Sequence, residues 1–252
     1  MPEGFVKTTH PNPAIAEITF SHPQHNSMPG YLLAELIKAI ETCGSDPNTE
    51  VIILKSGGDR TFCAGASFEE LMAIDNPESG KKFFLGFAGV INACRKCPKI
   101  IIGRVQGKSV GGGVGIASAV DYCLATKFAA IKLSELNIGI GPFVIGPAVT
   151  RRIGMAAFTQ LSLNANEFQT AEWALEKGMY AEVHESAETL DEAVIKLAQY
   201  LITTNPEARR QLKKVFWEGT DHWDELLAER AAMSGQLVLS DHTKATLKRY
   251  AS

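Results

Sequence analysis

The sequence contains no apolar run approaching the roughly 18 residues that a membrane-spanning helix needs. It also lacks an excess of positive charge: the formal net charge is -3 and the pI is about 6.1, which argues against a nucleic-acid-binding surface. Residues 1–10 show no basic head followed by an apolar stretch, so no signal peptide is predicted. The five cysteines lack the number and spacing of a disulfide framework. These absences predict a cytoplasmic protein with no membrane or nucleic-acid partner.

Ligand patterns for metals and nucleotides are missing as well. Cys94 and Cys97 have the separation of a zinc or redox pair, but no second cysteine pair or paired histidines accompany them. The glycine cluster at 111–115 fits the G-x-G-x-x-G pattern in no frame, and there is no Gly-Lys-Ser/Thr phosphate loop. The histidines show no ligand spacing; they are His10, His22, His25, His184, His222 and His242. We therefore expect neither a metal nor a cofactor.

What the sequence does contain is enough material for one large folded core. Its 252 residues are 45% hydrophobic and 21% charged, which is ordinary for a globular protein of this size. Short apolar segments predict strands at residues 14–20, 51–54, 100–105, 122–125 and 131–133, with a helical pattern at 31–42. The runs at 51–54 and 100–105 are apolar throughout, as buried parallel strands are.

After residue 141 the pattern becomes helical almost throughout. Helices are predicted at residues 166–177, 189–203, 206–217 and 222–239. No linker and no repeat of fixed period separates the two parts. The sequence thus predicts an α/β core over residues 1–190, followed by a helical region over residues 191–252.

Two glycine-rich segments, residues 61–67 and 105–115, are the most informative feature. Each follows a predicted strand and leads into a helical pattern. Glycine permits tight turns and close approach of a ligand, and free N–H groups at helix starts point toward negative oxygens. Two such loops facing each other would supply a pair of donors for one oxyanion, as chemistry on a carbonyl requires. The alternative is that both loops are only tight turns.

Four motifs in order and at matching separations resemble the crotonase (enoyl-CoA hydratase/isomerase) superfamily over nearly the whole chain. They lie at residues 22–27, at 62–66, from Val105 through the triple glycine to Asp121, and at 134–140. The resemblance implies an α/β fold, a spiral of repeated ββα units with a helical C-terminal region. It also implies an acyl-CoA thioester substrate and assembly as a homotrimer or homohexamer.

The resemblance also assigns roles to individual residues. Ala66 and Gly112 would donate their backbone N–H groups to the thioester oxygen, and Glu135 would be the catalytic carboxylate. The alternative for Glu135 is an exposed charge at a strand end. The expected substrate-binding residues are Ala64, Gly65, Gly111, Gly115 and Phe143.

One position departs from the pattern of the hydratases, which use two glutamates to hold and activate water. The first of these falls at Gly115, and only the second, Glu135, is present. A single carboxylate can still move a proton beside a thioester, which is the arrangement of the Δ3,Δ2-enoyl-CoA isomerases. The 4-chlorobenzoyl-CoA dehalogenases of the superfamily need an aspartate nucleophile at the position of Phe143, so dehalogenation is not expected. Hydration of an enoyl-CoA, for example of the methylglutaconyl type, and a weakly active CoA-binding protein are the alternatives.

The C-terminal helices carry two further patterns. Their apolar positions predict an oligomer interface; they are Leu212, Val215, Phe216, Trp217, Leu226, Leu227, Leu237, Val238 and Leu239. Their basic positions predict a solvated face, or else contacts to CoA phosphates; they are Arg209, Arg210, Lys213, Lys214, Lys244 and Lys248.

Overall fold

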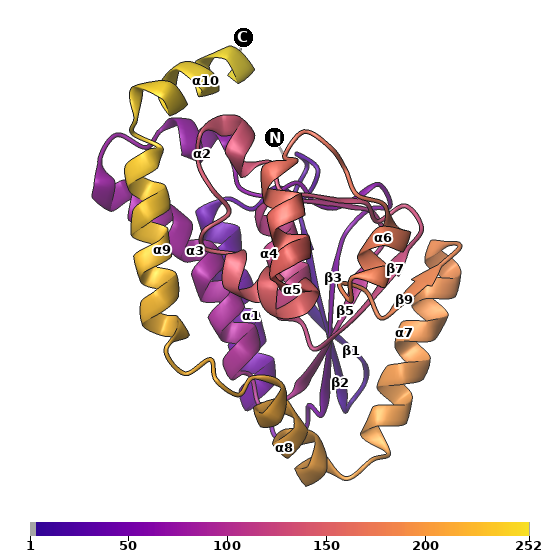
Figure 1. The fold of residues 1–252 in the computed structure, drawn as a ribbon. Coiled ribbons are helices and arrows are strands. Elements are labelled where there is room, and N and C mark those ends of the chain that lie inside the picture. Colours follow the sequence, from indigo (N-terminus) through magenta and orange to yellow (C-terminus); the bar gives the residue numbers. More distant parts are fainter. Residues whose placement is uncertain (1–3, 252) are drawn as a thin grey trace.

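The computed structural model describes residues 4–251, which form two β-sheets enclosed by helices (Figure 1). The larger sheet has six strands in the order β1-β2-β3-β5-β7-β9, and the smaller has three in the order β4-β6-β8. Among the strand pairs of the described residues, β1–β2 alone is antiparallel. The strands are β1 (Phe5–Asn12), β2 (Ile15–Ser21), β3 (Val51–Ser56), β4 (Thr61–Cys63), β5 (Ile100–Val105), β6 (Lys108–Val110), β7 (Tyr122–Thr126), β8 (Ile131–Lys132) and β9 (Glu182–His184).

The chain repeats one path three times, placing a strand in the large sheet, the next in the small sheet, and then helical structure. The helices are α1 (Gly30–Ser45), α2 (Phe68–Met72), α3 (Pro77–Lys96), α4 (Gly112–Ala119), the 3₁₀ turn η1 (Glu135–Ile138), α5 (Gly146–Leu163), α6 (Ala171–Glu176), α7 (Ala187–Ile202), α8 (Pro206–Phe216), α9 (Trp223–Leu237) and α10 (Asp241–Ala251). The predicted spiral of ββα units with helices at its C-terminal end is confirmed.

The large sheet is buried on both faces, which explains its continuously apolar strands. In β3, Val51 and Ile53 face α7, whereas Ile52 and Leu54 belong to the main core with α1, α3 and α4. Successive side chains of a strand point to opposite faces, so an apolar residue at every position means that both faces are covered. In Figure 1, α7 lies on one side of the sheet, and α1 and α3 lie on the other.

Two differences from the sequence expectations concern the edges of the large sheet. The edge strands β1 and β9 were not predicted, and β9 lies within the part of the chain that was expected to be helical. No side chain of β1 is fully buried, so its sequence lacks the apolar pattern of a buried strand, and β9 spans only three residues. The predicted boundary at residue 190 falls inside α7, whose residues Leu190, Val194 and Ala198 pack on the sheet.

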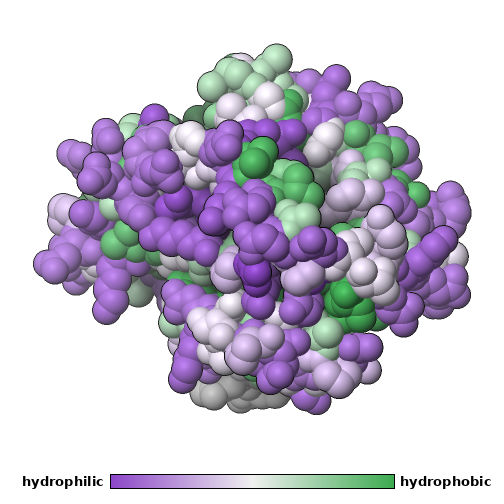
Figure 2. Space-filling model, turned by 90° about the horizontal axis from the view of Figure 1, so that it is seen from below, coloured by the Kyte–Doolittle hydropathy of each residue, from purple (hydrophilic) through white to green (hydrophobic). Residues whose placement is uncertain are grey.

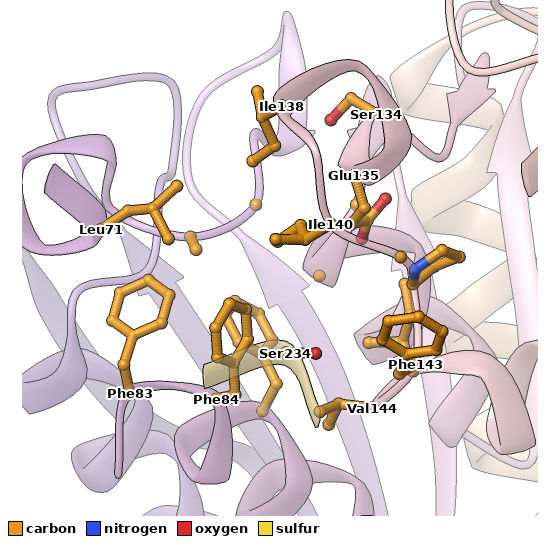
Figure 3. A pocket seen from close by; sticks show the side chains of 18 of the residues that line it. Leu71, Phe83, Phe84, Ser134, Glu135, Ile138, Ile140, Phe143, Val144 and Ser234 are labelled. Atoms are coloured by element: carbon orange, nitrogen blue, oxygen red, sulfur yellow. The ribbon is translucent and has the colours of Figure 1, made fainter. Parts of the chain in front are cut away.

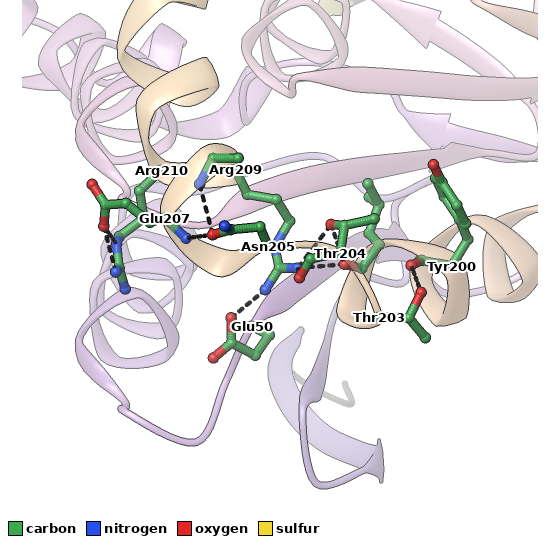
Figure 4. Close-up of polar contacts among 10 residues, drawn as sticks. Glu50, Tyr200, Thr203, Thr204, Asn205, Glu207, Arg209 and Arg210 are labelled. Carbon is green, nitrogen blue, oxygen red and sulfur yellow. Dashed lines mark hydrogen bonds and ion pairs between the residues drawn. The ribbon is translucent and has the colours of Figure 1, made fainter.

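Buried ion pairs fix α8 to the core, which corrects the expectation of a solvated basic face. Lys213 is only 3% exposed and lies 2.6 Å from Asp121 Oδ2, while Trp217 Nε1 donates to Asp121 Oδ1 at 2.9 Å. Arg209 of α8 is buried, donates to Leu201 O and Thr204 O at the end of α7, and pairs with Glu50, which precedes β3 (Figure 4). Neither Lys213 nor Arg209 is therefore available to a CoA phosphate.

Helix α9 runs along α3, and the two backbones touch at a pair of glycines (Figure 1). A Cβ atom on Gly80 would lie 2.7 Å from Gly235 O, and one on Gly235 would lie 2.5 Å from Lys81 N. Such distances exclude any side chain, so this crossing requires glycine on both helices.

The apolar residues of the C-terminal helices differ in burial. Trp217, Leu227 and Val238 are buried within this chain, so they are not free for an interface. Leu212, Val215, Phe216 and Leu237 remain exposed. Seen from below, on the side of α8, the surface is mostly hydrophilic with small separate hydrophobic groups (Figure 2).

All five cysteines are buried free thiols, and burial raises the pKa of Cys63, Cys94 and Cys123 to about 12. They are therefore protonated at neutral pH and poor metal ligands. Within residues 4–251 no group of His, Cys, Asp and Glu side chains is arranged to hold a metal ion. The same part of the chain contains no helix both long and apolar enough to cross a bilayer.

Candidate functional site

The site lies where the three parallel strands of the small sheet end. β4, β6 and β8 are neighbours in this sheet and run in the same direction. Because the carboxyl ends of parallel strands meet at one edge, the segments that follow them are brought together. These segments are residues 64–66, 111–112 and 134–135, so the two glycine loops and Glu135 face one space.

Two backbone amides at this edge are free to bind a ligand. Ala66 N–H and Gly112 N–H donate no hydrogen bond to any described residue. Gly112 is the first residue of α4, and the first bonds of this helix are donated by Val114 and Gly115 N–H to Gly111 O. The loops are in close contact, since a Cβ atom on Gly65 would lie 3.7 Å from Gly112 N.

The loop that precedes α1 holds the Ala66 segment in place. Ala64 N–H donates to His25 O at 3.1 Å, and Met28 N–H donates to Gly65 O at 2.8 Å. Asn26 in turn donates its side-chain amide to Gly57 O and Thr61 O. The motif at 22–27 therefore has a supporting role: it fixes the first glycine loop while leaving the Ala66 N–H unpaired.

Glu135 is carried by the turn η1, which follows β8 directly and is anchored from two directions. Asn137 donates its side-chain amide to Ala165 O at 2.8 Å, and Thr243 Oγ1 of α10 donates to Gly139 O at 3.0 Å. Gly139 ends the turn with a φ of +85°, a conformation that favours glycine. The position of the carboxylate is thus set by the strand before it and by helix α10.

The Glu135 carboxylate points into the site beside the second glycine loop. A Cβ atom on Gly111 would lie 3.0 Å from Glu135 Oε1, and Gly111 has a φ of +51°. Glu135 Oε2 is buried with no hydrogen-bond partner among the described residues. Burial disfavours the charged form and raises the pKa of Glu135 from 4.5 to about 7. A carboxyl group with this pKa can accept and return a proton at neutral pH.

These groups open onto a cavity of about 220 Å³ (Figure 3). Phe83 and Phe84 of α3 meet edge to face, with ring centroids 5.0 Å apart. The lining side chains are apolar, except those of Ser134, Glu135 and Ser234, and the lining residues without a side chain are glycines. The lining residues are Ala64, Gly65, Ala66, Phe68, Leu71, Phe83, Phe84, Phe87, Gly111, Gly112, Ser134, Glu135, Ile138, Ile140, Gly141, Pro142, Phe143, Val144, Ile145 and Ser234. The site therefore combines two free amide donors and one carboxyl group with an apolar pocket.

Every site residue expected from the sequence lines this cavity except Gly115. Gly115 lies in α4 with Ile145 packed against it, so the structure does not bring it to the cavity. The alternative of an exposed charge does not describe Glu135, whose Oε2 is buried.

Sequence patterns did not indicate the aromatic wall on α3 or the contribution of α9 to the cavity. Phe83, Phe84 and Phe87 have the spacing of one helix face, a pattern that predicts a helix here. No local signal indicates that this face meets the glycine loops, or that Ser234 joins them.

Comparison with known proteins identifies the family to which the chain belongs. A family model described as Enoyl-CoA hydratase/isomerase matches residues 10–252. Carnitinyl-CoA dehydratase from Escherichia coli K12 is 28% identical over 207 residues, which cover 81% of this chain and 77% of that protein. Ethylmalonyl-CoA decarboxylase from Xenopus tropicalis is 28% identical over 140 residues, covering 55% of this chain and 46% of the relative.

Two further comparisons concern length and fold. The bacillaene synthase dehydratase of Bacillus subtilis is 28% identical over 169 residues, which cover 64% of this chain and 64% of that protein. The chain thus spans about two thirds of the length of this dehydratase and about half the length of the decarboxylase. The crystal structure of an enoyl-CoA hydratase from Bacillus halodurans superposes with a TM-score of 0.89 at 22% identity, covering 97% of this chain and 99% of that one. At this identity the likeness shows a common fold.

Proposed function

This chain belongs to the enoyl-CoA hydratase/isomerase (crotonase) superfamily, and we propose that it converts 3-enoyl-CoA thioesters into 2-enoyl-CoA thioesters, with Glu135 as the only acid/base group. The substrate is an acyl-CoA thioester, and no cofactor takes part in the reaction. The acyl chain occupies the apolar cavity, while the thioester carbonyl lies at the two glycine loops.

In the proposed reaction the thioester oxygen accepts hydrogen bonds from Ala66 N–H and Gly112 N–H. These bonds strengthen as negative charge develops on the oxygen, which lowers the barrier to enolate formation. The Glu135 carboxylate removes a proton from C2, and the electrons delocalise over the dienolate. The protonated Glu135 then returns a proton at C4, so the double bond moves from C3–C4 to C2–C3 and the carboxylate is regenerated.

The observation that carries this proposal is that Glu135 is the one carboxylate among the described residues lining the cavity. Addition of water at C3 in the hydratases relies on a second carboxylate, and that position is Gly115, which Ile145 covers. A single group with a pKa of about 7 is present in both protonation states at neutral pH, as a proton shuttle requires.

A second candidate is hydration of an enoyl-CoA or the reverse dehydration. It is favoured by the names of two relatives, which are dehydratases, although the matched regions are only 28% identical. Among the described residues that line the cavity none is Lys, Arg or His, so a methylglutaconyl-type substrate would leave its distal carboxylate unpaired. A weakly active CoA-binding protein would bind acyl-CoA at the same loops without turnover.

The decisive assay follows 3-hexenoyl-CoA and crotonyl-CoA separately, with formation or loss of the conjugated thioester recorded by ultraviolet absorbance. We expect rapid isomerisation of the first and slow hydration of the second. Glu135→Gln keeps the shape of the side chain but removes the base, so its turnover should fall about 100- to 10,000-fold. Glu172→Gln, on the exposed side of α6, is the matched control and should retain full activity. Rapid hydration with no isomerisation would reject this proposal.

We further propose that the chain assembles as a homotrimer or a homohexamer through its helical region, residues 191–252. Leu212, Val215 and Phe216 on α8 remain exposed, as does Met155 on α5. Light scattering should give three or six times the chain mass of 27.3 kDa, and a monomer at micromolar concentration would contradict this assembly. The buried, unpaired thiols accord with a reducing, cytoplasmic compartment, which fractionation of cells would test.

A further inference from the structure

Ser234 places one hydroxyl group in the wall of an otherwise apolar part of the cavity. It lies on α9, is only 1% exposed, and lines the cavity. Serine hydroxyls within helices commonly donate to the carbonyl four residues earlier. Ser118 and Ser162 do so here, each at 2.7 Å, but the Ser234 hydroxyl makes no hydrogen bond with any described residue. In Figure 3 its oxygen lies between Phe84 and Val144.

The crossing of α3 and α9 explains how this residue reaches the cavity. Gly235, the next residue, touches Gly80 of α3 backbone to backbone. This contact removes the usual side-chain layer between the two helices and brings α9 against the wall that carries Phe84 and Phe87. The serine is thus held by rigid secondary structure, which favours precise placement of its hydroxyl.

The surroundings of Ser234 define what it can bind. A serine hydroxyl can donate one hydrogen bond and accept others. A carboxylate here would be desolvated without a counter-charge, because no cationic side chain is among the described lining residues. A neutral oxygen, by contrast, would satisfy the buried hydroxyl and lose little on leaving water.

We propose that Ser234 is a specificity-determining residue that hydrogen-bonds a neutral oxygen, as a hydroxyl or a ketone, on the acyl chain away from the thioester. The inference rests on the proposed function, which places the thioester at Ala66 and Gly112. The cavity, at about 220 Å³, exceeds the ~150 Å³ that accommodates a benzene molecule. The preferred substrates are therefore short, neutral acyl thioesters that carry such an oxygen.

Binding of saturated thioesters tests this inference separately from catalysis, since they carry no double bond to move. Calorimetry compares hexanoyl-CoA with hexanoyl-CoA bearing a hydroxyl at C4, C5 or C6, or a ketone at C5. In the wild-type protein at least one oxygenated thioester should bind about 3- to 10-fold more tightly than hexanoyl-CoA. Ser234→Ala should abolish this preference while retaining affinity for hexanoyl-CoA.

Two controls separate recognition from stability. Ser162→Ala removes a helical hydroxyl that bonds only within α5, and it should keep the wild-type preference. Ser234→Ala should not melt at a lower temperature than the wild type, because its hydroxyl has no partner to lose and alanine favours helix. A lower melting temperature with an unchanged preference would instead assign Ser234 a structural role and overturn the proposal.

The remaining outcomes are distinct from those that test the reaction. An equal preference in the wild type and Ser234→Ala, or no preference in either, overturns the role of Ser234 even if isomerisation is observed. A preference that depends on Ser234, found together with a fully active Glu135→Gln, supports this role and rejects the isomerase mechanism. If no CoA thioester binds, both proposals fail.

Discussion

Ile145 occupies the space into which a side chain at Gly115 would extend. A Cβ atom on Gly115 would lie 2.8 Å from Ile145 Cβ, and closer still to Ile145 Cγ2. The space that the first hydratase glutamate would need is therefore filled in this protein by Ile145.

Gly115→Glu should accordingly fail to create hydratase activity. The new carboxylate would be forced into a packed core, and we expect a loss of several kcal/mol of unfolding free energy. Chemical denaturation and a crotonyl-CoA assay measure the two effects. Gly115→Ala is the milder comparison, and its cost should shrink when Ile145 is also replaced by Ala, since the two positions are in contact. A stable Gly115→Glu protein that hydrates crotonyl-CoA would contradict this account.

The donor role of Gly112 can be tested only if room is made for a side chain. Phe87 covers Gly112, and a Cβ atom there would lie 2.7 Å from Phe87 Cδ1. Proline is tolerated at the first position of a helix, where its missing N–H breaks no helical bond. We therefore expect Gly112→Pro to fold in a Phe87→Ala background. Relative to Phe87→Ala alone, kcat/KM should fall about 100- to 1000-fold, as for loss of one oxyanion donor. Equal activity would remove Gly112 from the mechanism.

The raised pKa of Glu135 predicts a pH profile for the reaction. The carboxylate is the base, so kcat/KM for 3-hexenoyl-CoA should rise with pH and level off above about pH 7. A profile that is flat between pH 5 and 8 would show that another group removes the proton.

The same group makes the stability of the protein depend on pH. The folded state holds the Glu135 proton up to about pH 7, whereas the unfolded chain releases it near 4.5, so the folded state binds more protons between these values. The contribution of Glu135 to the free energy of unfolding is fully present below about pH 4.5 and is lost as the pH rises through 7. The loss is on the order of 3 kcal/mol. Glu135→Gln should lack this loss and be the more stable protein at pH 8. Denaturation at pH 5 and pH 8 provides the comparison.

The pair of Lys213 and Asp121 predicts a strong effect on stability away from the site. Both side chains are buried, so Lys213→Ala leaves the Asp121 carboxylate without its counter-charge. A loss of about 3–5 kcal/mol in unfolding free energy is expected. Lys214→Ala, one residue further on the exposed side of α8, should cost less than about 1 kcal/mol. Similar losses for the two variants would contradict the buried ion pair.

The resemblance of the four motifs to the superfamily predicted Ala66, Gly112 and Glu135 as site residues. The structure supplies the reason they meet: each follows a short strand, and these strands pair in parallel in one sheet. The buried strands were predictable from a local pattern, because a continuously apolar run such as 51–54 must be covered on both faces.

The rest depends on contacts between distant segments, for which local patterns carry no signal. Lys213 and Arg209 have the spacing of a solvated basic face, but both side chains are buried and pair with Asp121 and Glu50, which lie far away in the sequence. Likewise, the fit of Ile145 against Gly115 and the approach of Ser234 to the cavity are decided by packing between helices.

The backbone contact between Gly80 and Gly235 also means that one wall of the acyl cavity is made late in synthesis. The loops that carry Ala66, Gly112 and Glu135 leave the ribosome well before α9 does. Until α9 emerges, the face of α3 that it covers is open to solvent in the nascent chain. The acyl cavity thus receives its last wall only when residues 223–237 have been made, and the anchor of the Glu135 turn on α10 follows them.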